Sequence, residues 1–223
     1  MTGSANWPAM FEGDATIAQL LAPKQLATGT MAAARADGAP RASGIYAWYF
    51  DRIPAGIDAS SCHRAGDWTL LYCGISPKKP PLNGRPPSRS HVHQRLRTHF
   101  GGNAAGSTLR LTLGCLLEAE IGTILRRVGT TGRLTFTNPG EQLLDAWLHM
   151  HARVAWATHP APWEPEEKLL VSGLPLPLNI EGNPCAAFTG PLSALRSAAK
   201  RRAEALPLIG DSGGPRRAVG VQR

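Results

Sequence analysis

The sequence predicts a small α+β domain in which helices pack on a short sheet. Three observations indicate this class. The chain has 223 residues, of which 43% are hydrophobic, so it is long enough to bury one core of ordinary size. Its 24 glycines and 19 prolines favour many turns and few long elements. Two strand-like stretches come first along the chain, and stretches with helical spacing follow around further short strands.

Regular structure is predicted to begin at Ser43. Residues 1–42 form an irregular lead-in with one short helix over about Ala15 to Leu21, because MAAARADGAPRAS is rich in small and turn-forming residues. The aromatic and β-branched run from Ser43 to Phe50 predicts a strand, and the run from Asp67 to Ser76 predicts a second one. The long connection between the two strands excludes a tight hairpin.

A proline-rich basic loop follows the second strand, and helices follow the loop. Ser90 is a suitable N-cap for a helix over His91 to Phe100, which the glycines after it end. The later elements are predicted in this order: a helix over 107–120, a strand over 133–137, a helix over 140–152, a strand over 153–158, a helix from Pro162 to the Gly173 region and a basic amphipathic helix over 192–206. The last 17 residues are predicted to be a disordered tail.

The charge distribution points to a polyanionic partner. The net charge is +8, and the window from Trp68 to Leu117 contains no Asp or Glu. Seven fixed cations without an acid repel each other unless a polyanion or solvent offsets them, so nucleic acid is one interpretation and a solvated basic surface is the other. The cations in the window are Lys78, Lys79, Arg85, Arg89, Arg95, Arg97 and Arg110.

Other features of the sequence bear on its cellular compartment and on metal binding by cysteine and histidine. No run of about 18 apolar residues exists, so we expect no membrane-spanning helix. The N-terminus lacks a secretory pattern, so we expect a cytoplasmic protein. The four cysteines are scattered without a C-x-x-C pair, which favours reduced thiols. The H-x-H pairs at His91/His93 and His149/His151 lack a suitably spaced third ligand for zinc.

Five reactive side chains lie at the ends or on the faces of the predicted elements. Tyr46 and Tyr72 each occupy a strand beside a glycine, and Arg95 and His99 share one face of the following helix. Glu167 belongs to a late helix whose other face is apolar. Together these groups suit phosphodiester hydrolysis: the carboxylate holds a divalent ion, the arginine meets charge on the phosphate, and a phenol or imidazole orients water.

These residues occur in motifs that resemble those of the GIY-YIG nuclease superfamily. Gly44-Ile45-Tyr46 matches the first half of its signature, and Tyr72-Cys73-Gly74 resembles the second half with Cys73 in place of Ile or Val. The run from Arg95 to His99 is similar to the family's arginine helix. The twelve-residue step from Glu167 to Asn179 is similar to the family's metal-binding glutamate helix with its proline-asparagine turn. The order of the four motifs is that of the family.

The resemblance implies a GIY-YIG-like core with a short, mainly antiparallel sheet flanked by helices, over residues 43–185, plus an inserted helical segment at about 101–150. The basic helix (186–206) and the tail (207–223) follow the core. Two departures from the family pattern are a longer, more basic loop between Tyr72 and Arg95 and the inserted segment itself, which is the natural place for target recognition.

The resemblance also implies a metal-dependent DNA endonuclease with a one-metal site. Glu167 would bind Mg²⁺ or Mn²⁺ and Arg95 would contact the scissile phosphate. The water would be positioned and deprotonated by Tyr46, Tyr72 and His99, in roles that the sequence does not divide among them. Asn179 would support the site by hydrogen bonding. DNA would be bound by Lys78, Lys79, Arg85, Arg89, Arg97 and Arg110.

Alternatives remain open at this stage. Glu166 is the competing metal ligand, although it is expected to face elsewhere on the helix, and Glu141 is expected to interact with a helix dipole. A DNA-binding module with weak or no cleavage is the second function, and a structural or protein-interaction role is the third. The DNA specificity, the biological setting (restriction, repair or mobile element), and any homodimer or partner protein are not determined by the sequence.

Overall fold

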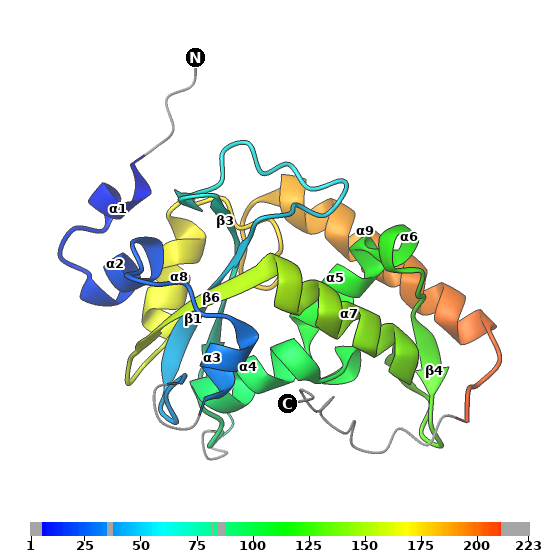
Figure 1. The fold of residues 1–223 in the computed structure, drawn as a ribbon. Coiled ribbons are helices and arrows are strands. Elements are labelled where there is room, and N and C mark those ends of the chain that lie inside the picture. Colours follow the sequence, from blue (N-terminus) through cyan, green and yellow to red (C-terminus); the bar gives the residue numbers. More distant parts are fainter. Residues whose placement is uncertain (1–5, 35–37, 82, 84–87, 211–223) are drawn as a thin grey trace.

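The computed structural model describes residues 6–34, 38–81, 83 and 88–210. Within these residues the centre of the molecule is a four-stranded sheet with the order β2-β3-β1-β6, in which every pairing is antiparallel. Figure 1 shows the sheet between two groups of helices, so the predicted α+β class is confirmed. The strands of this sheet are β1 (Gly44–Phe50), β2 (Arg64–Ala65), β3 (Trp68–Ser76) and β6 (Ala152–Thr158).

Strand β1 is buried on both of its faces, because helices cover the sheet on each side. Its side chains alternate between two apolar cores, as the pleat of a strand requires. Tyr46, Trp48 and Phe50 belong to the larger core, whereas Ile45 and Tyr49 belong to the smaller one. The reactive tyrosine of the strand therefore faces the larger helical layer.

The smaller core lies under two helices on the left of Figure 1. They are α2 (Ala15–Leu21) and α8 (Trp163–Val171), which contribute Ile17, Leu20, Leu169 and Leu170. The lead-in also contains α1 (Trp7–Met10) and α3 (Gly29–Ala33), which the sequence did not predict because each is only about one turn long.

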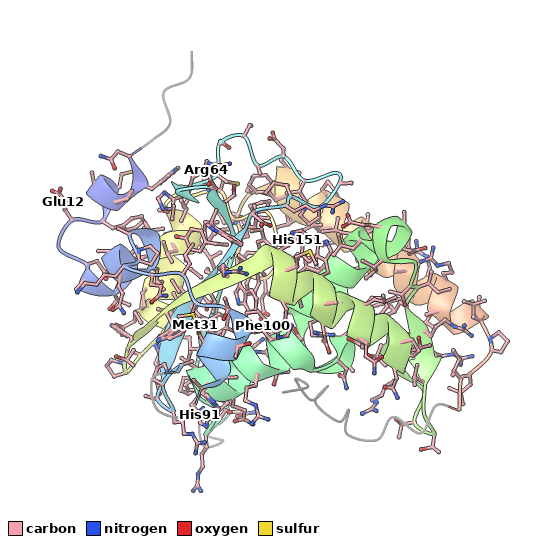
Figure 2. All side chains as sticks on the ribbon, in the orientation of Figure 1. Glu12, Met31, Arg64, His91, Phe100 and His151 are labelled. Carbon is pink, nitrogen blue, oxygen red and sulfur yellow. The ribbon has the colours of Figure 1, made fainter. Side chains whose placement is uncertain are left out.

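The larger core lies under helices from the middle and the end of the chain, on the right of Figure 1. Figure 2 shows the side chains between these helices and the sheet. These elements are α4 (Val92–Gly101), the 3-10 turn η1 (Ala104–Gly106), α5 (Thr108–Leu116), α6 (Glu118–Ile121), α7 (Asn138–His151) and α9 (Ala186–Ala205).

The inserted segment is a structural part of this layer. Leu109, Leu113, Leu144 and Leu148 of α5 and α7 are buried in the larger core. A small separate sheet of β4 (Arg126–Val128) and β5 (Arg133–Thr135) joins the two helices. The single predicted helix over 107–120 is divided into α5 and α6. Strand β4 was not predicted, because three residues carry too little periodicity to be recognised.

Candidate active site

Tyr46 and Tyr72 lie on the same face of neighbouring strands. In the register of β1 and β3, Tyr46 is opposite Gly74 and Trp48 is opposite Tyr72. A Cβ atom on Gly74 would lie 2.8 Å from the Tyr46 hydroxyl and 2.9 Å from its ring carbons. Because Gly74 has no side chain, the Tyr46 ring can lie across β3 at this position. This is the physical reason for a glycine two residues after Tyr72.

His99 is completely buried between Tyr46 and the start of α5. Its Nε2 lies 3.0 Å from the Tyr46 hydroxyl, and its Nδ1 lies 2.7 Å from Ser107 Oγ. Ser107 Oγ also accepts a hydrogen bond from the backbone N–H of Arg110, so it caps α5 and anchors the imidazole at once. Burial lowers the pKa of His99 well below its usual range, and the cations of Arg95 and Arg110 lower it further, so the imidazole is neutral.

Arg95 extends from α4 along the same side of the site. Its guanidinium donates to the carbonyl oxygen of Gly106 at 2.8 Å. Burial raises the pKa of Tyr72 to about 12, and Arg95 acts against this rise. Burial likewise raises the pKa of Tyr46 well above its usual range, with Arg95 again opposing it. Both phenols therefore remain protonated at neutral pH while a fixed positive charge lies next to them.

The two adjacent glutamates of α8 have different surroundings. Glu166 is half-buried and acts electrostatically on Tyr46 and Tyr72, whereas Glu167 is exposed, although both line the same cleft. The pKa of Glu166 is raised from 4.5 to about 7, chiefly by burial and also by the charge of Glu181, while Lys78 opposes the rise. The expectation that Glu166 faces elsewhere is thus corrected: it precedes the buried Leu169 and Leu170 by one helical turn and shares their face.

Asn179 binds the chain after α8 to the part of β3 that lies beyond its pairing with β2. Its side-chain oxygen accepts from the Cys73 N–H and its amide nitrogen donates to the Cys73 carbonyl, both at 2.9 Å. The backbone N–H of Leu178 donates to the Leu71 carbonyl at 3.0 Å. Asn179 is 5% exposed, so these bonds are shielded from water. The pairing holds α8 and its glutamates beside Tyr72.

The reactive side chains line one cleft of about 1060 Å³. Tyr46, Tyr72, Arg95, Glu166 and Glu167 all contribute to its wall, and His99 lies directly behind Tyr46. Among the described residues no group of three or more His, Cys, Asp or Glu side chains gathers closely enough to hold a metal ion by protein ligands alone.

The predicted DNA-binding cations are not all in one place. Lys78 and Lys79 line the cleft, and Lys78 forms an exposed ion pair with Glu181 at 3.1 Å. Arg89 and Arg97 are exposed but do not line the cleft, and Arg85 lies outside the described residues. Arg196 of α9 lines the cleft, and its buried Nε has no hydrogen-bond partner among the described residues.

Arg110 corrects the prediction of a DNA contact, because its side chain is completely buried. Its guanidinium pairs with the carboxylate of Glu141, lies 2.7 Å from that of Asp145, and donates to the carbonyl oxygens of His99 and Phe100. Glu141, expected to interact with a helix dipole, also accepts from the Ala104 N–H at 2.8 Å. The network holds the end of α4, and with it His99, against α5 and α7.

Sequence reasoning did not identify Ser107 and Arg196 as part of the site, and it named Glu166 only as the competing metal ligand. Ser107 carried a signal, since a serine before an apolar periodic run predicts an N-cap, but nothing in the sequence showed that it also binds His99. For Glu166, a count of helical spacing back from Leu169 and Leu170 would have pointed to the correct face. Arg196 carried no signal, because α9 has several basic residues.

Comparison with known proteins agrees with this geometry. A family model described as the GIY-YIG catalytic domain matches residues 44–198. The matched range begins at the first residue of β1 and includes β3, α4, α8 and Asn179. No curated protein and no solved structure matches the chain. Within the described residues, no helix has the length and apolar character needed to cross a membrane. Because the match covers more than half of the sequence, the chain belongs to the GIY-YIG family, which is a nuclease-type family.

Proposed function

We propose that the protein is a metal-dependent endonuclease that hydrolyses phosphodiester bonds of DNA. The observation that carries this proposal is the convergence of two phenols, a guanidinium and a carboxylate on one cleft, with a neutral imidazole behind one phenol. Membership of the GIY-YIG family supports the same class of reaction. The basic residues on two walls of the cleft, Lys78 and Lys79 on one segment and Arg196 on another, match the charge of a phosphate backbone.

Glu166 is the residue that we propose as the metal ligand, in place of Glu167. Its carboxylate is half-buried, lines the cleft and has no hydrogen-bond or ion-pair partner among the described residues. A single carboxylate with room for water suits Mg²⁺ or Mn²⁺, because Mg²⁺ keeps much of its water shell and is commonly held by one or two carboxylates and the substrate phosphate. When bound, such an ion supplies positive charge to the phosphate oxygens.

The Tyr46–His99 pair is arranged to take the proton of the attacking water. Tyr46 faces the cleft, so its oxygen is available to accept a proton from water while its own proton passes to His99 Nε2, 3.0 Å away. The water oxygen then bonds to phosphorus as the bond to the leaving oxygen breaks. Part of the low basicity of His99 comes from the charge of Arg95. A phosphate bound at Arg95 offsets that charge, so substrate binding strengthens the base.

Arg95 and Tyr72 are placed to bind the phosphate. Arg95 lines the cleft, and its guanidinium is held by the Gly106 carbonyl, so little reorganisation is needed to meet charge that develops on the phosphate oxygens. Tyr72 is a hydrogen-bond donor throughout the neutral range, since burial raises its pKa to about 12. Both residues therefore stabilise negative charge, whereas Tyr46 and His99 move the proton.

Adjacent substitutions on α8 provide the test. Glu166→Gln should lower the rate of Mg²⁺-dependent nicking of supercoiled plasmid DNA by about 100-fold or more, because it removes a carboxylate that acts on both tyrosines. Glu167→Gln is the matched control and should retain most of the activity, since this side chain is exposed. If only Glu167→Gln loses activity, the metal ligand is Glu167 and not Glu166. Wild-type protein that binds DNA but never nicks it with any divalent metal would overturn the nuclease proposal.

A further inference from the structure

A second pocket lies on the other side of α4 from the catalytic cleft. It has a volume of about 460 Å³ and is lined by basic and polar residues: Arg41, His91, His93, Gln94, Arg97 and Thr98. Among the described residues no carboxylate lines it. Gln94 and Thr98 line both this pocket and the cleft, so the two hollows are separated by one helix. None of the proposed catalytic side chains belongs to it.

His93 marks the pocket as more than a solvated basic surface. The residue is 6% exposed, and its Nε2 is buried without a hydrogen-bond partner in the described part of the chain. A buried polar atom without a partner is unfavourable, and the side chain that carries it lines this pocket. The neighbouring His91 uses its Nδ1 to accept from the Gln94 N–H at 3.1 Å, which leaves its Nε2 as a donor. Figure 2 shows His91 at the edge of the molecule, where α4 begins.

The charge of the pocket selects an anion. Arg41 and Arg97 are exposed and carry fixed positive charges, and the rings of His91 and His93 lie 6.0 Å apart. Burial lowers the pKa of His91, and His93 and Arg41 lower it further, which reports a positive potential at this position. A metal cation would meet two guanidinium groups here, whereas a phosphate would meet two fixed charges and imidazole donors.

We propose that this pocket binds a second backbone phosphate of the DNA strand whose scissile phosphate lies at Arg95. The inference rests on the proposed function, because it takes the same strand as the ligand of both hollows. His91, the N-cap of α4, precedes Arg95 by four residues, about one helical turn, so a strand that crosses the helix at Gln94 and Thr98 contacts both sites. The pocket thereby fixes the register of the strand in the cleft without reading its bases.

The experiment measures binding of a short DNA duplex to the full-length protein in EDTA, so that cleavage plays no part. The double variant Arg41→Gln/Arg97→Gln should bind more weakly and reduce the slope of log affinity against log salt by about 1. The matched control is Arg133→Gln/Arg201→Gln, which removes two exposed charges that line neither hollow and should leave the slope nearly unchanged. Equal losses in the two double variants would overturn the proposal, because they would show an unspecific effect of net charge.

Imidazole NMR signals of His91 and His93 provide a second readout. Addition of the duplex should shift both signals in wild type, and in Glu166→Gln as well, but not in the Arg41→Gln/Arg97→Gln variant. Signals that respond to inorganic phosphate but not to the duplex would assign the pocket to a free anion and overturn the DNA assignment. A protein that nicks DNA without these shifts would refute the second phosphate site alone. Shifts without any nicking would refute the nuclease proposal alone.

Discussion

Substitution of Arg110 distinguishes a structural arginine from a DNA contact. Arg110→Met keeps a long unbranched side chain but removes the guanidinium from a fully buried position. The carboxylates of Glu141 and Asp145 then lose their cation, and the carbonyl oxygens of His99 and Phe100 lose a donor. We expect the free energy of unfolding to fall by about 3–5 kcal/mol, which is the usual cost of removing one partner from a buried ion pair.

Thermal unfolding followed by circular dichroism measures this loss. For a chain of this length the midpoint should fall by about 10 °C. Arg97→Met is the control, because the same substitution at an exposed position of α4 should change the free energy of unfolding by less than about 0.5 kcal/mol. An Arg110→Met protein that melts like wild type but binds DNA more weakly would refute this reasoning and restore Arg110 to the DNA-binding set.

Three further predictions concern the cleft. Gly74→Ala places a methyl group 2.8 Å from the Tyr46 hydroxyl, so the buried ring must move. We expect nicking to slow by about 100-fold and the free energy of unfolding to fall by about 1–3 kcal/mol; an unchanged rate would contradict the close approach. Asn179→Ala removes two buried hydrogen bonds to Cys73 and should cost about 2–4 kcal/mol in urea unfolding, whereas a wild-type midpoint would show that the pairing is dispensable. Glu166 has a pKa of about 7 in the folded state, above its usual 4.5. Between these two pH values the folded state binds a proton that the unfolded state releases. The free energy of unfolding, measured in EDTA, should therefore fall as the pH rises from 4.5 to about 7. Glu166→Gln should abolish this fall, and parallel pH profiles for the two proteins would refute the assignment.

Much of the site was predictable because its residues follow the alternation of strands and the spacing of helices. The alternation of β1 and β3 placed Tyr46 and Tyr72 on one face, and the four-residue spacing on α4 placed Arg95 and His99 together. These periodicities belong to the backbone and do not depend on the rest of the fold. The short elements α1, α3 and β4 were missed, since they are stabilised by packing rather than by their own sequence.

The choice between Glu166 and Glu167 as the proposed metal ligand depends on the rotation of α8 about its axis. Adjacent residues on a helix point about 100° apart, so Glu166 and Glu167 lie on different faces of α8 and have different surroundings. The rotation of α8 is decided by Leu169 and Leu170, which pack into the smaller core. In the packed structure Glu166 shares the face of Leu169 and Leu170 and is half-buried, whereas Glu167 is exposed.

The sequence by itself determined the kind of reactive groups, their order along the chain and the strands and helices that carry them. The tertiary structure decided which charges are buried and which are free to meet a ligand. Arg110 and Arg97 are both arginines of one acid-free window, yet Arg110 is enclosed by Glu141, which is 31 residues away in the chain, while Arg97 remains in solvent. The burial of a charge depends on partners that only folding brings together, because desolvation is tolerated only where opposite charges and hydrogen bonds are already in place.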